Sequence, residues 1–321
     1  MKKVVIVADA AASIGSGHIM RCLTIANNLV KYQCCISFVM RDLPGNLIEY
    51  VKKQGFEHSF EYINADLYII DRYDIDIEEE KQIRKYTKYI MVIDDLANRK
   101  HDCDILLDQS FLPNYSTRYD LLIPEHSVKL LGPKYLILRD EFLSVRQSRK
   151  ISSINRLLVF MGGSDPTSET LKILEALQGI SFKQIDIVVG NSNVNNEEIR
   201  QICIDRNYLY HQQIDYMAQL MSKADLAFGA GGIAAWERYY VGLPSICTIV
   251  AENQRLGTTY AGQIQACINL GWHEEVSATT YKNILSSITV NKLQQISDKG
   301  LILTKNNKQN AWLYSILELL Q

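Results

Sequence analysis

The chain has 321 residues, of which 47% are hydrophobic and 22% charged, and its formal net charge at pH 7 is -2. The composition is that of an ordinary globular protein, and the length allows two domains, each with its own core. A net charge so close to zero gives no electrostatic basis for binding nucleic acid or anionic membrane. No apolar run approaches the ~20 residues that span a bilayer. We therefore expect neither nucleic-acid partners nor stable membrane insertion.

The seven cysteines are scattered along the chain, and none forms a C-x-x-C pair. An odd number of thiols, several of them within apolar runs, is typical of reduced, buried cysteines in a cytoplasmic protein. The same scatter argues against a structural zinc site. We expect a cytoplasmic protein with no metal and no cofactor. The sequence leaves the oligomeric state open, with a monomer as the favoured interpretation.

Strands and helices alternate along the first half of the chain. An apolar strand at 4–8 precedes the turn Ile14-Gly15-Ser16-Gly17-His18, and apolar positions then recur at helical spacing over 19–32. The alternation continues with strands expected at 35–40, 67–71 and 89–94, helices at 46–54 and 77–87, and shorter apolar runs at 105–107 and 130–131. This order predicts a doubly wound α/β domain.

A charged and polar stretch at 139–155 lacks periodicity and is the best linker candidate. We therefore place the domains at 1–145 and 146–321. The second series has strands expected at 156–161, 184–189, 224–228 and 245–250, and helices at 168–178, 197–206, 217–223, 234–240, 263–270, 281–288 and 308–320. The fold class is thus α/β with two Rossmann-like domains, and the last helix could pack back on the first domain.

A glycine-rich turn, Gly229-Ala230-Gly231-Gly232, stands between a strand and a helix of the second domain. Glycines let the backbone approach a ligand, and the free N–H groups of a helix start attract phosphate. Glu237 follows about one helical turn later, within reach of a sugar hydroxyl beside a bound phosphate. The alternative is a tight turn without a ligand.

His18 ends a second glycine turn and begins a helix, at the sheet edge where α/β proteins bind ligands. The helix N-terminus disfavours protonated histidine, which suits a general base at neutral pH. A helix residue bonded to nearby backbone is the alternative. The turn is not the dinucleotide fingerprint, because the spacing leads to His18 and Arg21 instead of a third glycine.

Polar side chains also follow other strands. Asp94 and Asp95 could act as acid, base or metal ligands, although strand-end aspartates also satisfy loop backbone. Asp71 and Tyr73 share that position in the first domain, and Asn253-Gln254 have it in the second, where a solvated loop is the alternative.

Several motifs together resemble the family of UDP-2,4-diacetamido-2,4,6-trideoxy-β-L-altropyranose hydrolases of pseudaminic acid synthesis, and the spore coat polysaccharide biosynthesis proteins are similar too. The matching stretches cover nearly the whole chain and are, in order, Asp9 with Ile14 to Leu23, Ile93 to Arg99, His101 to Asp104, Gly132 to Tyr135 with Leu138-Arg139, Met161 to Pro166, and Gly229 to Pro244.

The resemblance implies a GT-B-like fold related to the bacterial cell-wall N-acetylglucosaminyl transferase, with a UDP-sugar in the cleft between two domains. It makes His18 the base that activates water and Glu237 the ligand of the ribose. The remaining expected substrate contacts are the first turn with Gly15, Gly17 and Arg21, the diphosphate cradle of Gly162, Gly163, Gly231 and Gly232, the uracil segment with Ile214 and Met217, and the sugar-side residues Tyr73, Asn253 and Gln254.

Three positions depart from the family pattern. Val7 stands where members usually have Arg, and Ile233-Ala234 stand where they have Ser-Thr after the glycine pair. Those two hydroxyls would be natural phosphate donors, so backbone N–H groups must do more here or affinity falls.

The resulting hypothesis is an inverting hydrolase that releases UDP from a UDP-sugar. It has two rivals: a glycosyltransferase of the same fold that uses a sugar hydroxyl in place of water, and a non-catalytic nucleotide-sugar binding protein.

Overall fold

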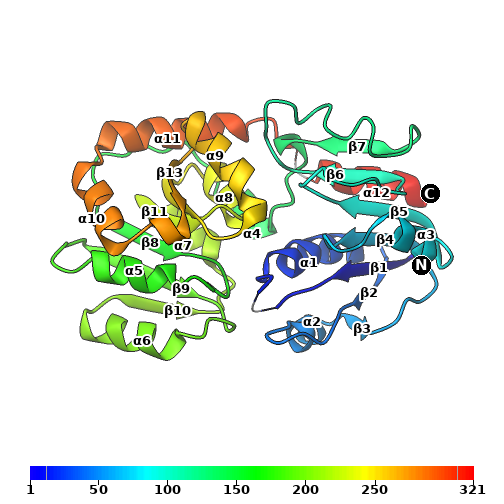
Figure 1. Ribbon diagram of the computed structural model, residues 1–321, viewed down its shortest axis with the longest axis horizontal. Helices are drawn as coiled ribbons and strands as arrows, with labels where there is room; N and C mark the ends of the chain where they lie inside the picture. Colours follow the sequence, from blue (N-terminus) through cyan, green and yellow to red (C-terminus); the bar gives the residue numbers. More distant parts are fainter. Residues whose placement is uncertain (12, 309) are drawn as a thin grey trace. The chain divides into compact units, whose positions relative to one another are not determined.

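The computed structural model describes residues 1–11, 13–308 and 310–321. The chain forms two compact units (Figure 1), one made of Met1–Leu138 with Asn306–Gln321 and the other of Arg139–Lys305. The domain boundary expected from the sequence stays a prediction. Each unit is built on a parallel sheet covered by helices, which is the two-part α/β class expected from the sequence.

The first unit contains a seven-stranded sheet in the order β3-β2-β1-β4-β5-β6-β7. Every paired strand in it is parallel. The strands are β1 Lys3–Ala8, β2 Cys35–Val39, β3 Glu57–Ser59, β4 Ala65–Asp71, β5 Thr87–Ile93, β6 Ile105–Asp108 and β7 Val128–Leu131. Chain order reverses between β1 and β4, so the topological switch point lies there.

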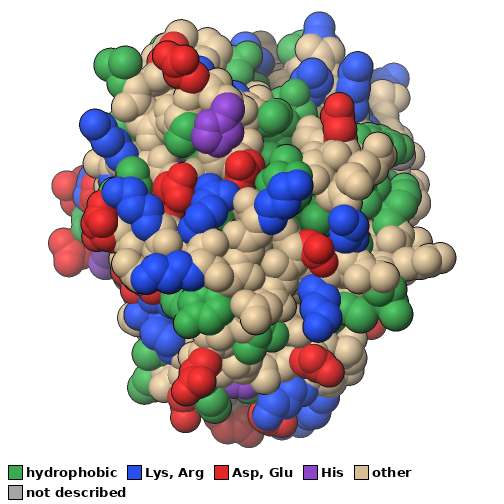
Figure 2. Space-filling model, turned by 90° about the vertical axis from the view of Figure 1, so that its right-hand side faces the viewer, with side chains coloured by type: hydrophobic (Ala, Val, Ile, Leu, Met, Phe, Trp, Pro, Cys, Tyr) green, Lys and Arg blue, Asp and Glu red, His purple; other side chains and the backbone are tan. Residues whose placement is uncertain are grey.

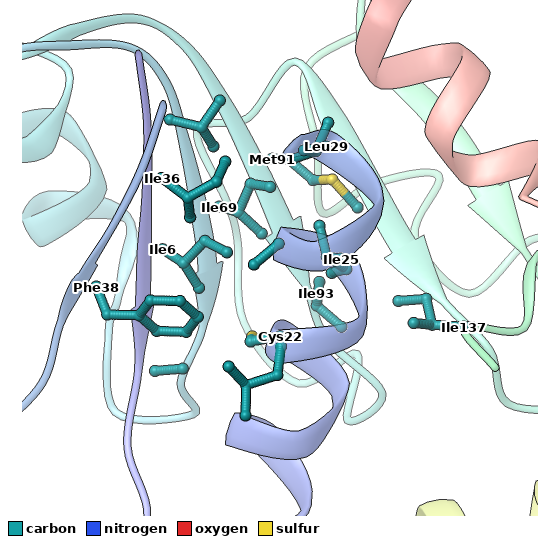
Figure 3. Close-up of a cluster of buried hydrophobic side chains, with 14 of the residues drawn as sticks. Ile6, Cys22, Ile25, Leu29, Ile36, Phe38, Ile69, Met91, Ile93 and Ile137 are labelled. Carbon is teal, nitrogen blue, oxygen red and sulfur yellow. The ribbon is translucent and has the colours of Figure 1, made fainter. Parts of the chain in front are cut away.

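Helix α1 provides the main core of this unit. Its apolar side chains, among them Cys22, Ile25 and Leu29, pack on Ile6 and Ile69 of the sheet (Figure 3). The C-terminal helix contributes Trp312 and Ile316 to the same core. The helices are α1 Gly17–Val30, α2 Ile48–Lys53, α3 Ile77–Ile83, the 3-10 turn η1 Pro133–Tyr135 and α12 Ala311–Leu320.

The second unit has a six-stranded parallel sheet in the order β10-β9-β8-β11-β12-β13. Its strands are β8 Arg156–Phe160, β9 Gln184–Val189, β10 Leu209–Gln212, β11 Leu226–Ala230, β12 Ser245–Ile249 and β13 Ile268–Trp272. Here the switch point lies between β8 and β11. The helices are α4 Asp140–Leu143, α5 Glu169–Ala176, α6 Asn196–Asp205, α7 Met217–Lys223, α8 Ile233–Tyr240, η2 Glu252–Gln254, α9 Arg255–Gln263, η3 His273–Glu275, α10 Ala278–Ser287 and α11 Val290–Leu303.

The polar stretch expected as a linker is held against the second unit by two arginines. Arg146 donates to the carbonyls of Tyr240 and Leu301, at 2.7 and 2.9 Å. Arg149 donates to the carbonyls of Val241 and Ala224, at 2.9 and 2.5 Å. These carbonyls lie at or near helix C-termini, where cations are favoured. The charged stretch therefore attaches this segment of the chain to the helices of the second unit.

One predicted helix is wrong. The segment 263–270 was expected to be helical, but α9 ends at Gln263 and β13 begins at Ile268. Gln265 adopts a left-handed conformation with φ of 62°, which stops the helix. The next apolar residues then pair with β12 at the sheet edge.

The face of the molecule in Figure 2 carries acidic and basic side chains interspersed with one another. All seven cysteines lie within the described residues and are free, and Cys35 is the exposed one. In the described ranges, no helix is both long and apolar enough to cross a membrane.

Candidate functional site

The carboxyl ends of β1 and β4 meet at the switch point of the first unit, where His18 and Asp71 come together. Asp71 is the last residue of β4, and His18 lies in the first turn of α1, which follows β1. Gly15, with φ of 84°, reverses the chain before the helix, and Gly17 is the first helical residue. The turn thus directs the start of α1 to the edge where open α/β sheets bind ligands.

His18 and Asp71 form a buried pair. His18 Nδ1 lies 2.7 Å from Asp71 Oδ1, and His18 is 9% exposed. Because an ionised carboxylate can only accept, Nδ1 carries the hydrogen and Nε2 is left as a proton acceptor. A histidine held in one tautomer by a carboxylate is the arrangement of a general base.

Arg21 keeps Asp71 ionised. Its Nε donates to Oδ2 at 2.9 Å and its Nη2 to Oδ1 at 2.6 Å, and both residues are buried. Burial by itself would raise the pKa of Asp71, but the charge of Arg21 and the hydrogen bonds from His18 and Arg21 outweigh it and hold that pKa well below its usual range. Arg21 therefore stabilises the ionised carboxylate of Asp71. Its expected contact with substrate stays a prediction.

Tyr73 lies beside this pair. Its ring meets the His18 imidazole edge-on, with centroids 4.9 Å apart, and its hydroxyl donates to Asp95 Oδ1 at 2.8 Å. Burial raises the pKa of Asp95, although the nearby charge of Arg21 opposes the rise. The structure thus brings together His18, Arg21 and Tyr73. The expected set of site residues lacked Asp71 and Asp95, although each was noted as a strand-end residue.

Other acidic residues of the first unit form hydrogen bonds and ion pairs that hold the fold together. Asp94 accepts from the Ala97 N–H at 2.8 Å and from Arg99 Nη1 at 2.7 Å, as expected of a strand-end residue that satisfies a loop. Asp102 and Asp104 both accept from Arg84. Within residues 1–11, 13–308 and 310–321, no group of three or more His, Cys, Asp or Glu side chains is placed to hold a metal ion.

The switch point of the second unit is lined by the two predicted glycine turns. Phe160 of β8 pairs with Gly229 of β11, so the residues that follow each strand are neighbours at the same edge. Gly162 has φ of 104°, a conformation that favours glycine, and a side chain there would meet no other atom within 4 Å. Gly232 is the N-cap of α8. The first turn therefore presents open backbone at this edge, and the second places a helix N-terminus there.

Glu237, the expected ribose ligand, is buried and ion-paired. Arg139 donates to its Oε1 through Nε and Nη2, both at 2.9 Å. Arg139 also contacts Glu141 Oε1 at 2.7 Å, and Glu141 Oε2 accepts from the Ala218 N–H in the first turn of α7. This chain of bonds connects Glu237 with the start of α7. No pattern in the sequence indicates these bonds, because Arg139 and Glu237 are far apart along the chain.

The remaining predicted contacts lie on neighbouring loops of the second unit. Met217 begins α7 and is buried, while Ile214 just before it is half-buried. Asn253 is exposed in η2. Gln254 bonds directly to the glycine turn, since its Oε1 accepts from the Gly231 N–H at 3.2 Å. The roles of these residues toward a ligand stay predictions.

No protein-family model matches the chain. The chain is 29% identical over 237 residues to the UDP-2,4-diacetamido-2,4,6-trideoxy-beta-L-altropyranose hydrolase of Campylobacter jejuni, which covers 70% of this chain and 82% of the relative. It is 29% identical to the spore coat polysaccharide biosynthesis protein SpsG of Bacillus subtilis, and this alignment covers 86% of this chain and 85% of SpsG. The uncharacterized protein MJ1062 of Methanocaldococcus jannaschii is 29% identical over 79% of this chain, which spans 57% of that protein's length.

Solved structures show the same fold at low sequence identity. MurG of Acinetobacter baumannii aligns over 99% of both chains with a TM-score of 0.64 and 13% identity. Anabaena HepE, solved in complex with UDP and glucose, covers 100% of this chain and 99% of its own, with a TM-score of 0.56 and 12% identity. The predicted GT-B fold and the resemblance to the hydrolase and spore coat proteins are confirmed.

Proposed function

We propose that this protein is a nucleotide-sugar enzyme, and specifically a hydrolase that releases UDP from a UDP-linked 2,4-diacetamido-2,4,6-trideoxy sugar in the cytoplasm. The observation that carries the proposal is the buried pair of His18 and Asp71 at the switch point of the first unit. The substrate class is suggested by the name of the Campylobacter jejuni relative.

The proposed reaction is attack of water at the anomeric carbon. His18 Nε2 removes a proton from the water as its oxygen bonds to the sugar, and the bond from the anomeric carbon to the phosphate oxygen breaks. UDP leaves with the bonding electron pair, and the sugar is released with inverted configuration. Asp71, at 2.7 Å from Nδ1, holds the ring in its tautomer and stabilises the imidazolium that forms.

The second unit supplies the nucleotide site in this proposal. Gly162, Gly163, Gly231 and Gly232 offer backbone near the diphosphate, Glu237 bonds the ribose hydroxyls, and the segment with Ile214 and Met217 lies along the uracil. Backbone N–H groups and the N-terminus of α8 stabilise the negative charge on the departing UDP. The open backbone at Gly162 and the N-cap position of Gly232 support this assignment.

The test is UDP release from UDP-sugars by the purified protein without any acceptor. In water enriched in oxygen-18, we expect the label in the sugar and none in UDP, because the carbon–oxygen bond breaks. His18→Asn should lower turnover by about 10²–10⁴-fold, the usual contribution of a general base, while UDP still binds. His126→Asn is the matched control, since that side chain is 63% exposed. Undiminished turnover in His18→Asn would remove His18 from the mechanism.

A glycosyltransferase is the second candidate, favoured by the similarity to the spore coat polysaccharide protein SpsG over 86% of this chain. In that case UDP is released only when an acceptor with a free sugar hydroxyl is present. A third outcome, tight UDP binding with no release under either condition, would indicate a nucleotide-sugar binding protein.

A further inference from the structure

The side chain of Gln254 lies over the glycine turn that follows β11. Its Oε1 accepts from two main-chain N–H groups, that of Gly231 at 3.2 Å and that of Val250 at 3.3 Å. Gly231 follows β11 and Val250 follows β12, so the ends of two adjacent parallel strands aim at one acceptor. Main-chain N–H groups that converge on one oxygen form a binding place for anionic oxygens.

A buried hydroxyl without a partner lies against the same turn. Thr258 is 3% exposed, and its Oγ1 has no hydrogen-bond partner among the residues that the structure describes. A Cβ on Gly231 would overlap Oγ1, so the hydroxyl is in direct contact with the turn. Gln254 precedes Thr258 by four positions at the start of α9, which places both on one helix face. Because an unsatisfied buried hydroxyl is costly, its presence here needs an explanation.

A buried cation lies against Gly229, the first residue of the turn. Arg238 of α8 is 1% exposed, and its Nη2 donates to the Ala230 carbonyl at 2.6 Å. Its Nε and Nη1 have no hydrogen-bond partner in the described part of the chain, and the guanidinium fills the space that a Cβ on Gly229 would need. This charge makes the turn more favourable for a negative ligand.

We propose that this position is a phosphoryl-oxygen subsite, and that the Gln254 carbonyl is a displaceable stand-in for that oxygen. When a phosphate or diphosphate ester binds, Gln254 swings away, Gly231 and Val250 donate to the phosphoryl oxygen, and the hydroxyl of Thr258 becomes its third donor. The exchange is favourable because hydrogen bonds to an ionised acceptor are about twice as strong as those to an amide oxygen. Identifying the ester as the diphosphate of a UDP-sugar rests on the proposed function.

The proposed subsite compensates for the absence of hydroxyl side chains at Ile233 and Ala234. These residues stand where hydroxyl side chains were expected to donate to phosphate, and neither carries a polar group. Thr258 supplies a hydroxyl from α9, and Val250 adds a main-chain donor from the end of β12. The lost donors on α8 are thereby replaced from neighbouring elements.

The test is calorimetric titration of the full chain with UDP, inorganic pyrophosphate and uridine. Gln254→Ala removes the stand-in and should tighten UDP and pyrophosphate several-fold. Gln254→Glu puts a carboxylate on the same N–H groups and should weaken both ligands by about tenfold or more. Uridine, which has no phosphate, should bind equally to both variants, and Gln263→Ala at the exposed end of α9 is the control. If both Gln254 variants weaken UDP or neither changes it, the stand-in role is overturned.

Thr258→Val gives an independent measurement. Removing an unpartnered buried hydroxyl should raise the melting temperature, while UDP and pyrophosphate lose a donor and bind about tenfold or more weakly. Unchanged affinity in this variant would overturn the role of Thr258 as a donor.

The ligands separate the two proposals. Pyrophosphate could bind more tightly to Gln254→Ala and more weakly to Gln254→Glu while UDP does not bind at all. That result would support the subsite and contradict the nucleotide assignment. UDP binding that is indifferent to Gln254 and Thr258 would keep the proposed function and overturn the subsite. If the wild-type chain binds neither ligand, both proposals fail.

Discussion

At its switch point the first unit gathers charged side chains, whereas the second unit gathers glycines at the corresponding place. Arg21 neutralises the buried Asp71 carboxylate, which also bonds to His18, so the positions of these side chains depend on buried charge balance. Gly162 instead leaves its backbone open, and Gly231 packs directly against Thr258 with no room for a side chain of its own. One topology thus places charged side chains at one switch point and main-chain N–H groups at the other.

The comparison predicts that the first site fails when one charge is removed. Asp71→Ala leaves the Arg21 guanidinium buried without its carboxylate, so we expect a loss of about 3–5 kcal/mol in the free energy of unfolding. Turnover should fall as well, because His18 loses its orienting partner. Adding Arg21→Met should restore much of the stability but not the turnover. Chemical denaturation and UDP release measure the two effects, and a double variant as unstable as the single one would contradict this account.

In the second unit, the question is whether the buried carboxylate of Glu237 binds the ligand or only stabilises the fold. Glu237→Ala should weaken UDP binding several-fold to a hundredfold, as expected for hydrogen bonds of about 1.5–3 kcal/mol to a charged group. The exposed Glu252→Ala is the control. Unchanged UDP affinity with a lower melting temperature would assign Glu237 to its bond with Arg139 alone.

Part of the pH dependence of stability should come from the first unit. His101 is buried with Nδ1 2.6 Å from Glu80 Oε1, and its Nε2 is 3.9 Å from Asp94 Oδ2. Burial lowers the pKa of His101, but the Asp94 and Glu80 carboxylates outweigh it and raise that pKa above its usual range. A raised pKa contributes stability that is full below about pH 6.5 and is lost as pH rises through the folded value.

We therefore expect the contribution of His101 to the free energy of unfolding to fall from neutral toward alkaline pH, by at most about 1.4 kcal/mol per pH unit for one proton. His101→Gln should flatten this slope, and His126→Gln should not. Denaturation at a series of pH values is the measurement, and an equal slope in wild type and His101→Gln would place the sensitivity elsewhere.

The smallest effect concerns the lost hydroxyls of α8. Ile233 and Ala234 are half-buried, so hydroxyl side chains there have room to reach a ligand. Ile233→Ser with Ala234→Thr should tighten UDP several-fold, since about 1.4 kcal/mol is tenfold in affinity. Calorimetry and melting of the same variant decide the matter, because lower melting without tighter binding would mean that Ile233 serves packing.

The sequence predicted much of the alternation of strands and helices, because buried strands such as β1 and β8 are apolar runs after their first residue. It missed the helices α9 and α11 and the strand β13. It also missed β3 and β10, which are short edge strands of largely polar residues, Glu-His-Ser and Leu-Tyr-His-Gln. Their pairing depends on a neighbouring strand and leaves no hydrophobic pattern to read. The predicted ends of helices near glycines and left-handed residues were the least accurate, because no hydrophobic pattern marks them either.

For the candidate site, the sequence indicated His18 and the glycine turns, because both follow strands and begin helices. It could not indicate that Arg139 pairs with Glu237 or that Gln254 reaches Gly231, since both contacts join distant segments. Asp71 was detectable in principle. Once β4 is placed beside β1, its last residue must lie next to the start of α1.

The contact between Gly229 and Arg238 sets an order on how this sequence can evolve. A side chain at 229 would overlap the Arg238 guanidinium, so a change of Gly229 requires that buried guanidinium to move. Arg238 can change first, because losing a buried guanidinium opens a hole without creating an overlap. The two positions are therefore epistatic, and viable lineages should show a shorter residue at 238 before any side chain at 229. Descendants that have kept Arg238 should all have kept the glycine.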